Sequence, residues 1–254
     1  MAATTDTDHQ EHTDASGRPP SAARRRRGRG IALVVSVLGE LLITAGLVLG
    51  LFVVYSLWWT NVVADRAAGK QADKVRDDWA EDRVGQDGPG ALDTKAGIGF
   101  LHVPAMGKGD VLVEKGTSMK ILNDGVAGYY TDPVKSALPT SGKEGNFALA
   151  AHRDGHGAKF HNIDKIEKGD PIVFETKDTW YVYKVYGILP ETSKYNVKVL
   201  GAVPEESGKT KPGHYITLTT CTPVYTSRYR YVVWGELVRT EKVDGDRTPP
   251  EELR

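Results

Sequence analysis

The sequence predicts a mainly all-β domain with short helices, preceded by one transmembrane helix. From about 95 to 240, short β-branched and aromatic runs alternate with glycine, proline, asparagine and aspartate, the composition of strands joined by turns. From Ile31 to Leu57 the chain is almost wholly apolar and long enough to span a bilayer. The net charge of zero over 254 residues argues against a nucleic-acid partner.

Residues 1–30 form a basic tail, with arginines concentrated at 24–29 and no aliphatic run that would build a core. Such a segment is most simply disordered. The apolar run contains one charged residue, Glu40, but the uncharged stretch Leu41–Trp59 alone suffices to span a membrane. The apolar region of a cleaved signal peptide, the alternative, is only about 7–15 residues long. We therefore expect an uncleaved transmembrane signal anchor over 31–59.

The arginine cluster precedes the anchor, so the positive-inside rule predicts a single-pass protein of the cell membrane. The amino terminus is then cytoplasmic and the chain from about residue 60 is extracellular. Residues 60–95 form a spacer whose alternating charges fit either an exposed helical stalk or a disordered segment, and Gly85–Gly90 breaks any helix there. Residues 96–240 form the folded domain and 241–254 form a C-terminal tail, in which we expect Asp244–Pro250 to be loose.

Some 145 residues are enough for one hydrophobic core. Helical turns are expected at Thr117–Leu122 and Phe160–Ile166. Seven or eight short strands at this spacing predict a barrel or a sandwich. The seven visible runs are Ile98–Val103, Val111–Val113, Asn146–Ala151, Pro171–Glu175, Trp180–Ile188, Tyr215–Cys221 and Tyr231–Val238.

Cys221 is the only cysteine of the chain, which excludes an internal disulfide. It ends the strand-like run that begins at His214, and the two-residue period of a strand places Thr217, Thr219 and Cys221 on one face. A free cysteine is usually a small buried hydrophobic residue. A reactive cysteine, the alternative, requires partners that move protons and stabilise charge.

Two such partners are visible. His152 directly follows the apolar run Phe147–Ala151, and strand ends are where functional groups tend to be displayed. Arg230 opens a run that can pair antiparallel with the Cys221 strand and bring a fixed positive charge near the thiol. Arg228 is a rival two residues away. The alternatives are a histidine that follows a strand by chance and an arginine on the surface of a final strand.

Three features together resemble the sortases, the membrane-anchored cysteine transpeptidases of Gram-positive bacteria. They are the run Thr217–Cys221, Arg230 nine residues later, and the segment Gly145–Phe160 with its histidine. The resemblance covers roughly residues 96–240 and implies an eight-stranded sortase-type β-barrel. The form Thr-Leu-Thr-Thr-Cys-Thr-Pro and the distance from His152 to Cys221 are similar to class E, the housekeeping type of actinobacteria.

The resemblance implies that Cys221 cleaves a Leu-Ala-x-Thr-Gly-type sorting signal of secreted proteins between Thr and Gly, forming a thioacyl enzyme. A peptidoglycan precursor amine then resolves this intermediate. His152 would move the protons and Arg230 would steady the oxyanion. The geometry this requires is that the sulfur, the imidazole and the guanidinium converge at one mouth of the barrel.

The substrate-binding candidates are Tyr130, Thr219 and Thr220. Tyr130 occupies the family segment that contacts the second position of the signal, although Tyr129 or Tyr130 could equally be a core aromatic. We expect no cofactor and no metal: the group His152, Asp154, His156 and His161 lacks the His-Glu-x-x-His spacing and is interrupted by glycines. The rival functions are a secreted cysteine peptidase that transfers to water and a membrane-tethered β-domain that binds wall or protein ligands without chemistry.

Overall fold

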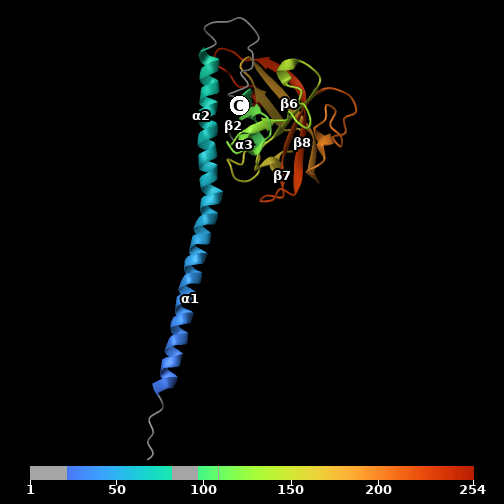
Figure 1. The fold of residues 1–254 in the computed structure, drawn as a ribbon. Coiled ribbons are helices and arrows are strands. Elements are labelled where there is room, and N and C mark those ends of the chain that lie inside the picture. The colour runs from blue at the N-terminus through green and yellow to red at the C-terminus, as the bar shows by residue number, and fades with distance from the viewer. Residues whose placement is uncertain (1–21, 82–96, 108) are drawn as a thin grey trace, which may run out of the picture. The chain divides into compact units, whose positions relative to one another are not determined.

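The computed structural model describes residues 22–81, 97–107 and 109–254 (Figure 1). The chain divides into two compact units, the first ending at Phe52 and the second beginning at Val53. The boundaries of the five segments predicted above stay a prediction.

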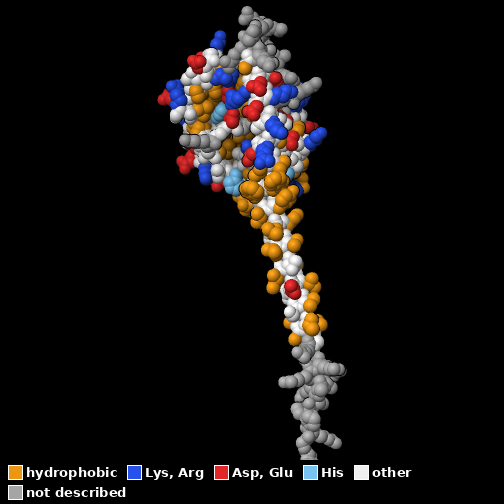
Figure 2. Space-filling view, turned by 90° about the vertical axis from the view of Figure 1, so that its left-hand side faces the viewer, with side chains coloured by type: hydrophobic (Ala, Val, Ile, Leu, Met, Phe, Trp, Pro, Cys, Tyr) orange, Lys and Arg blue, Asp and Glu red, His pale blue; other side chains and the backbone are white. Residues whose placement is uncertain are grey.

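The first unit is dominated by the helix α1, Ala22–Val54. Its stretch Gly30–Val54 is 25 residues long, apolar, and not buried in the protein. Helical rise makes it about 37 Å long, against a hydrocarbon core of about 30 Å. Figure 2 shows hydrophobic side chains exposed along this helix. The prediction of a disordered tail to residue 30 was wrong for its last nine residues, because arginine is a good helix former and extends the apolar helix backwards. Residues 1–21 lie outside the described residues.

The second unit contains the last two residues of α1 and then a π-helical turn, Tyr55–Trp59, that leads into α2, Thr60–Glu81. Of the two readings left open for the spacer, the structure shows a helix, and the helix does not stand free. Helix α2 runs along the outside of the barrel (Figure 1). Ala68, Val75 and Trp79 recur on its packed face, and Trp79 meets Phe100 edge to face at 5.4 Å. The glycine-rich breaker at 85–90 lies outside the described residues.

Eight strands close into a barrel in the order β1-β2-β3-β4-β7-β8-β6-β5, which confirms the predicted mainly β architecture. Pairing is antiparallel except for β2 with β3 and β4 with β7. The strand that is not among the seven predicted runs is β3, which has three residues and is too short to show a period in the sequence. The strands are β1 Gly99–His102, β2 Asp110–Lys115, β3 Ala127–Tyr129, β4 Gly145–Ala150, β5 Pro171–Glu175, β6 Thr179–Ser193, β7 His214–Thr222 and β8 Tyr229–Lys242.

Short helices complete the domain, and two of them fall within the predicted helical turns. The short helices are α3 Met119–Leu122 and the 3-10 turns Pro104–Met106, Pro139–Ser141, Ile163–Lys165, Val197–Leu200 and Glu251–Leu253. The turn at 163–165 supplies Ile163, which is fully buried in the core together with Phe160.

The buried clusters show which residues of the barrel wall point inward and which point outward. Phe147 and Leu149 of β4, Ile216 and Leu218 of β7, and Val233 of β8 belong to one buried cluster inside the barrel. Because side chains alternate along a strand, their neighbours point outward. A second cluster covers the outer face of the same wall and consists of Ala148, Val199, Leu200, Val232 and Trp234.

A buried carboxylate joins three separate parts of this unit. Glu175 on β5 is 2% exposed and accepts from His102 Nε2 at 2.9 Å and from Arg247 Nη2 at 2.6 Å, while Arg76 of α2 lies 3.3 Å away. Burial alone would raise the pKa of Glu175, but the hydrogen bonds from His102 and Arg247 and the charge of Arg76 outweigh it. The pKa is lowered to about 2.

The expectation that Asp244–Pro250 is loose was wrong. β8 continues to Lys242, and Arg247 donates to the carbonyl oxygens of Thr176 at 2.9 Å and Lys177 at 3.1 Å. Its guanidinium also lies over the ring of Trp79, with 4.6 Å to the ring centroid. The turn-rich composition of this segment was visible in the sequence, whereas its distant partners were not.

The first prediction concerns Glu175→Gln, which should lower the free energy of unfolding at pH 7 by on the order of 3 kcal/mol. The folded pKa lies below the unfolded one, so the stabilisation is fully present above about pH 4.5 and is lost as pH falls through about 2. Urea unfolding of the full chain in detergent at several pH values measures this.

The matched control is Glu205→Gln, which removes an exposed pair with Lys198 and should change stability by less than about 0.5 kcal/mol. A Glu175→Gln effect that is small, or that does not shrink in acid, would contradict the assignment.

Candidate active site

Cys221 lies near the carboxyl end of β7, on the outer face of the barrel wall. Ile216 and Leu218 point into the core, so Thr217, Thr219 and Cys221 point the other way, in agreement with the two-residue period. Cys221 itself is partly exposed. The thiol is therefore not sealed in the interior. It sits at the rim, outside the barrel rather than in its lumen.

Arg230 stands directly opposite the cysteine on the neighbouring strand. The antiparallel register of β7 and β8 pairs Cys221 with Arg230, and directly opposed residues have Cβ atoms about 4.5–5.5 Å apart. Nη1 of Arg230 donates to the carbonyl oxygens of Tyr229 at 2.9 Å and Ser227 at 3.2 Å. Within the described part of the chain, Nε and Nη2 make no hydrogen bond, which leaves donors for a ligand beside the sulfur.

Arg228, the rival, is exposed and lies before the first residue of β8. Its guanidinium is stacked over the ring of Tyr229, with 5.1 Å to the ring centroid. The strand register therefore favours Arg230 as the cation that faces the thiol.

His152 is level with Cys221 on the other side of β7. In the parallel pair of β4 and β7, Ala150 is the partner of Thr219, and His152 and Cys221 each lie two residues further on. Adjacent strands are about 4.8 Å apart. The backbone N–H of Ala151 donates to Thr219 O at 3.3 Å, which carries the alignment past the end of the strand. His152, Cys221 and Arg230 thus lie side by side at the ends of three adjacent strands.

The imidazole of His152 is fixed by a residue that the sequence did not single out. Its Nε2 lies 2.9 Å from Oδ1 of Asn123, in the turn after α3. An acceptor there keeps a proton on Nε2 and leaves Nδ1 to exchange protons. Burial lowers the pKa of His152, the nearby ring of His156 lowers it further, and Asp154 opposes both. The neutral ring is therefore favoured at neutral pH.

Two side chains next to His152 tie its loop to the strand of the cysteine. Arg153 is buried and donates to Thr222 Oγ1 at 2.9 Å and to Asp164 at 2.8 Å. Asp154 accepts from the backbone N–H of Tyr225, in the β7–β8 connection, at 2.6 Å. Sequence reasoning missed these contacts: it considered Asp154 only as a metal ligand and gave Arg153 no role.

The structure separates the two tyrosines. Tyr129 belongs to the barrel core, whereas Tyr130 reaches the outer face, where its hydroxyl lies 3.1 Å from Thr219 Oγ1. Burial raises the pKa of Tyr130, while the hydrogen bond to Thr219 and the positive charge of Arg230 lower it, so its hydroxyl lies within electrostatic range of Arg230. Tyr130 and Thr219 therefore border the face that carries the three candidate residues.

Thr220 is placed differently. It is 3% exposed, shares the parity of the core residues, and donates through Oγ1 to the carbonyl oxygen of Ala151 at 2.7 Å. This bond fixes the last residue before His152 to the strand of the cysteine.

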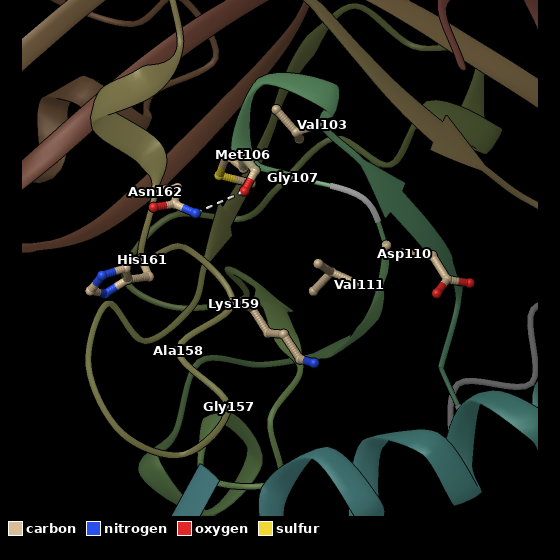
Figure 3. A pocket seen from close by; sticks show the side chains of 11 residues that line it. Val103, Met106, Gly107, Asp110, Val111, Gly157, Ala158, Lys159, His161 and Asn162 are labelled. Carbon is tan, nitrogen blue, oxygen red and sulfur yellow. Dashed lines mark hydrogen bonds between the residues drawn. The ribbon is translucent and has the colours of Figure 1, made fainter. Parts of the chain in front are cut away.

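A separate hollow of ≈ 200 Å³ is lined in part by residues of the segment 157–162, which follows His152 (Figure 3). Asp110, Lys159, His161 and Asn162 supply its polar lining, and Asn162 is held by a hydrogen bond to Met106 O at 3.0 Å. None of the three candidate catalytic residues lines it.

A closed β-barrel with a cysteine, a histidine and an arginine side by side at its rim fits a cysteine transpeptidase. Comparison with known proteins shows the family. A sortase domain matches residues 101–238. Sortase SrtE2 of Streptomyces coelicolor is 83% identical over 257 residues, covering 100% of both chains. Sortase SrtE1 of the same species is 48% identical over 221 residues, which are 85% of this chain and 62% of the relative.

Solved structures give the same result. The crystal structure of Sortase E1 from Streptomyces coelicolor with a tripeptide in the active site matches with a TM-score of 0.59 and 47% identity, covering 62% of this chain and 96% of that chain. Sortase E from Streptomyces avermitilis matches with a TM-score of 0.54 and 34% identity, covering 62% and 97%. The chain belongs to the sortase family and is most like its class E members.

Proposed function

We propose that this sortase cleaves a Leu-Ala-x-Thr-Gly-type sorting signal between Thr and Gly and joins the threonine to an amine of a peptidoglycan precursor. The observation that carries the proposal is the placement of His152, Cys221 and Arg230 on one outer face, at the ends of three adjacent strands. A relative carries a tripeptide in its active site, which supports a peptide as ligand of the corresponding site here.

In the first step, the sulfur of Cys221 bonds to the threonine carbonyl carbon and the thiol proton passes to His152. The free donors of Arg230 lie where the carbonyl oxygen gains negative charge. His152 then gives its proton to the glycine nitrogen as the C–N bond breaks. The products are a thioacyl enzyme and a peptide with a glycine amino terminus.

In the second step, the acceptor amine attacks the thioester carbon and the bond to Cys221 breaks. His152 takes the proton from the attacking nitrogen and returns one to the thiolate, which restores the resting enzyme. Because burial and the ring of His156 lower the pKa of His152, its imidazole is in the neutral form that can take this proton.

Tyr130 and Thr219 are proposed to contact the second position of the signal, because they border the site on the outer face. The hydroxyl of Thr220 is buried and engaged with Ala151, so we assign it the positioning of the segment that leads to His152 rather than direct contact with the peptide. The arginines at 24–29 before the apolar helix support a single-pass topology with a cytoplasmic amino terminus and an extracellular catalytic domain.

The test of this function uses the full chain in detergent with a Leu-Ala-x-Thr-Gly peptide and an oligoglycine amine. Mass spectrometry should find a ligated peptide, in larger amount than with a Leu-Pro-x-Thr-Gly peptide. Hydrolysis alone, which leaves a peptide with a free threonine carboxyl group, would favour the peptidase alternative. A peptide that stays uncleaved would favour a non-catalytic binding domain.

The second prediction is that Arg230→Ala lowers the acylation rate by about 10²–10³-fold, the usual effect of removing an oxyanion donor. Melting of the domain should change little, because the side chain is only partly buried. Arg228→Ala, two residues away and exposed, is the matched control and should act within about twofold of the wild type. Equal losses in the two variants would exclude the proposed role of Arg230.

A further inference from the structure

The first turns of α2 contact the loop that follows His152. The backbone N–H of Gly157 donates to Oδ1 of Asn61 at 2.9 Å, and Nζ of Lys159 lies 2.9 Å from Oδ1 of Asp65. Asn61 and Asp65 are four residues apart, so they lie on the same face of the helix. Two contacts from one face thus hold one short loop.

This loop has a backbone that needs outside support. Four consecutive residues, Gly155 to Ala158, are left-handed, with φ of 61°, 47°, 80° and 40°. Glycine adopts such angles freely, whereas His156 and Ala158 pay a conformational penalty for them. Gly157, whose N–H donates to Asn61, lies between these two residues. The loop conformation is therefore maintained in part by α2.

The same part of α2 also packs on the turn after α3, whose Asn123 holds the imidazole of His152. Gly125 has a φ of 77°, and a Cβ added to it would lie 2.9 Å from the carbonyl oxygen of Ala64. Asn123, two residues earlier, is the partner of His152 Nε2. A Cβ added to Gly157 would meet both Asp65 Oδ1 at 3.0 Å and Gly125 Cα at 3.2 Å. Helix, turn and loop are in direct contact, without space for a further side chain.

We propose that Asn61 is a positioning residue for His152, acting through the loop at 155–158, and that Asp65 assists it. The inference rests on the proposed role of His152 as proton carrier. Asn61 is the stronger of the two because it accepts a backbone N–H and is partly buried. Asp65 is 54% exposed, and an ion pair in that setting contributes little. The helix that follows the apolar segment then belongs to the catalytic unit.

The test measures kcat and KM for acylation by a reporter peptide, with the full chain in detergent. Asn61→Ala should lower kcat about tenfold, the scale of a slightly misplaced catalytic group, with KM unchanged within about twofold. Asn61→Asp keeps an acceptor oxygen and should retain most of the rate. Asp73→Ala, on an exposed position of the same helix, is the matched control and should behave as the wild type.

A kcat that survives Asn61→Ala would overturn the proposal, as would a loss that Asn61→Asp fails to rescue. So would a loss fully accounted for by a lower melting temperature. If the wild type itself forms no thioacyl enzyme, the proposed function fails but the inference is still tested. The ring signals of His152 in NMR spectra should then shift in Asn61→Ala and not in Asp73→Ala, and unchanged signals would overturn it.

Discussion

Cys221→Ala should abolish formation of the thioacyl enzyme. The variant lacks the only thiol of the chain, so no other side chain can form a thioester. The sulfur is partly exposed at the end of β7, and its removal leaves the core residues on the opposite face, Ile216 and Leu218, in place. The fold should therefore survive while the chemistry is lost. Intact-mass spectrometry after incubation with the sorting peptide measures both adduct and protein.

Cys221→Ser provides the control for this result. It preserves size and polarity but replaces the thiol with a much weaker nucleophile. We expect it to melt like the wild type and to form no adduct. Cleavage of the peptide by either variant would show that the cysteine is not the nucleophile.

His152→Ala should lower the acylation rate by about 10²–10⁴-fold, the range expected for loss of a positioned proton carrier. The ring is held by Asn123 and is partly buried. Its removal therefore leaves a space the size of an imidazole ring that free imidazole can enter from solvent. Added imidazole should therefore restore part of the rate to His152→Ala and nothing to Cys221→Ala. Stopped-flow or discontinuous assays with a reporter peptide measure these rates.

His214→Ala is the matched control, because His214 begins the same strand that Cys221 nearly ends. It should retain the wild-type rate within about twofold. If both histidine variants are equally slow, or if imidazole rescues neither, His152 does not carry the proton.

The sequence predicted the strands well where a two-residue period was long enough to read. All seven runs became strands, and the parity of Thr217, Thr219 and Cys221 was correct. The prediction missed β3, because three residues cannot display a period. The strand pattern by itself left barrel and sandwich open, since closure depends on which strands pair across the sheet and not on any one strand. The eight-stranded barrel was predicted from the resemblance to the sortases, and the structure confirms it.

The candidate site was predictable in its main residues and not in its supports. Motif spacing pointed to His152, Cys221 and Arg230, whose placement follows from strand register. Asn123 contacts His152 from 29 residues away, and Asn61 contacts Gly157 across 96 residues. Amide side chains in turns and helices are common, so nothing local marks these two. Their function exists only once the chain is folded.

The most direct test of this account is the intact mass of the full chain trapped during turnover of a Leu-Ala-x-Thr-Gly peptide without an acceptor amine. The added mass should equal that of the peptide up to its threonine less one water, and it should be located on Cys221 by fragmentation and released when oligoglycine is added. An acyl group found on another residue, or a wild type that stays unmodified while the peptide is consumed, would contradict it.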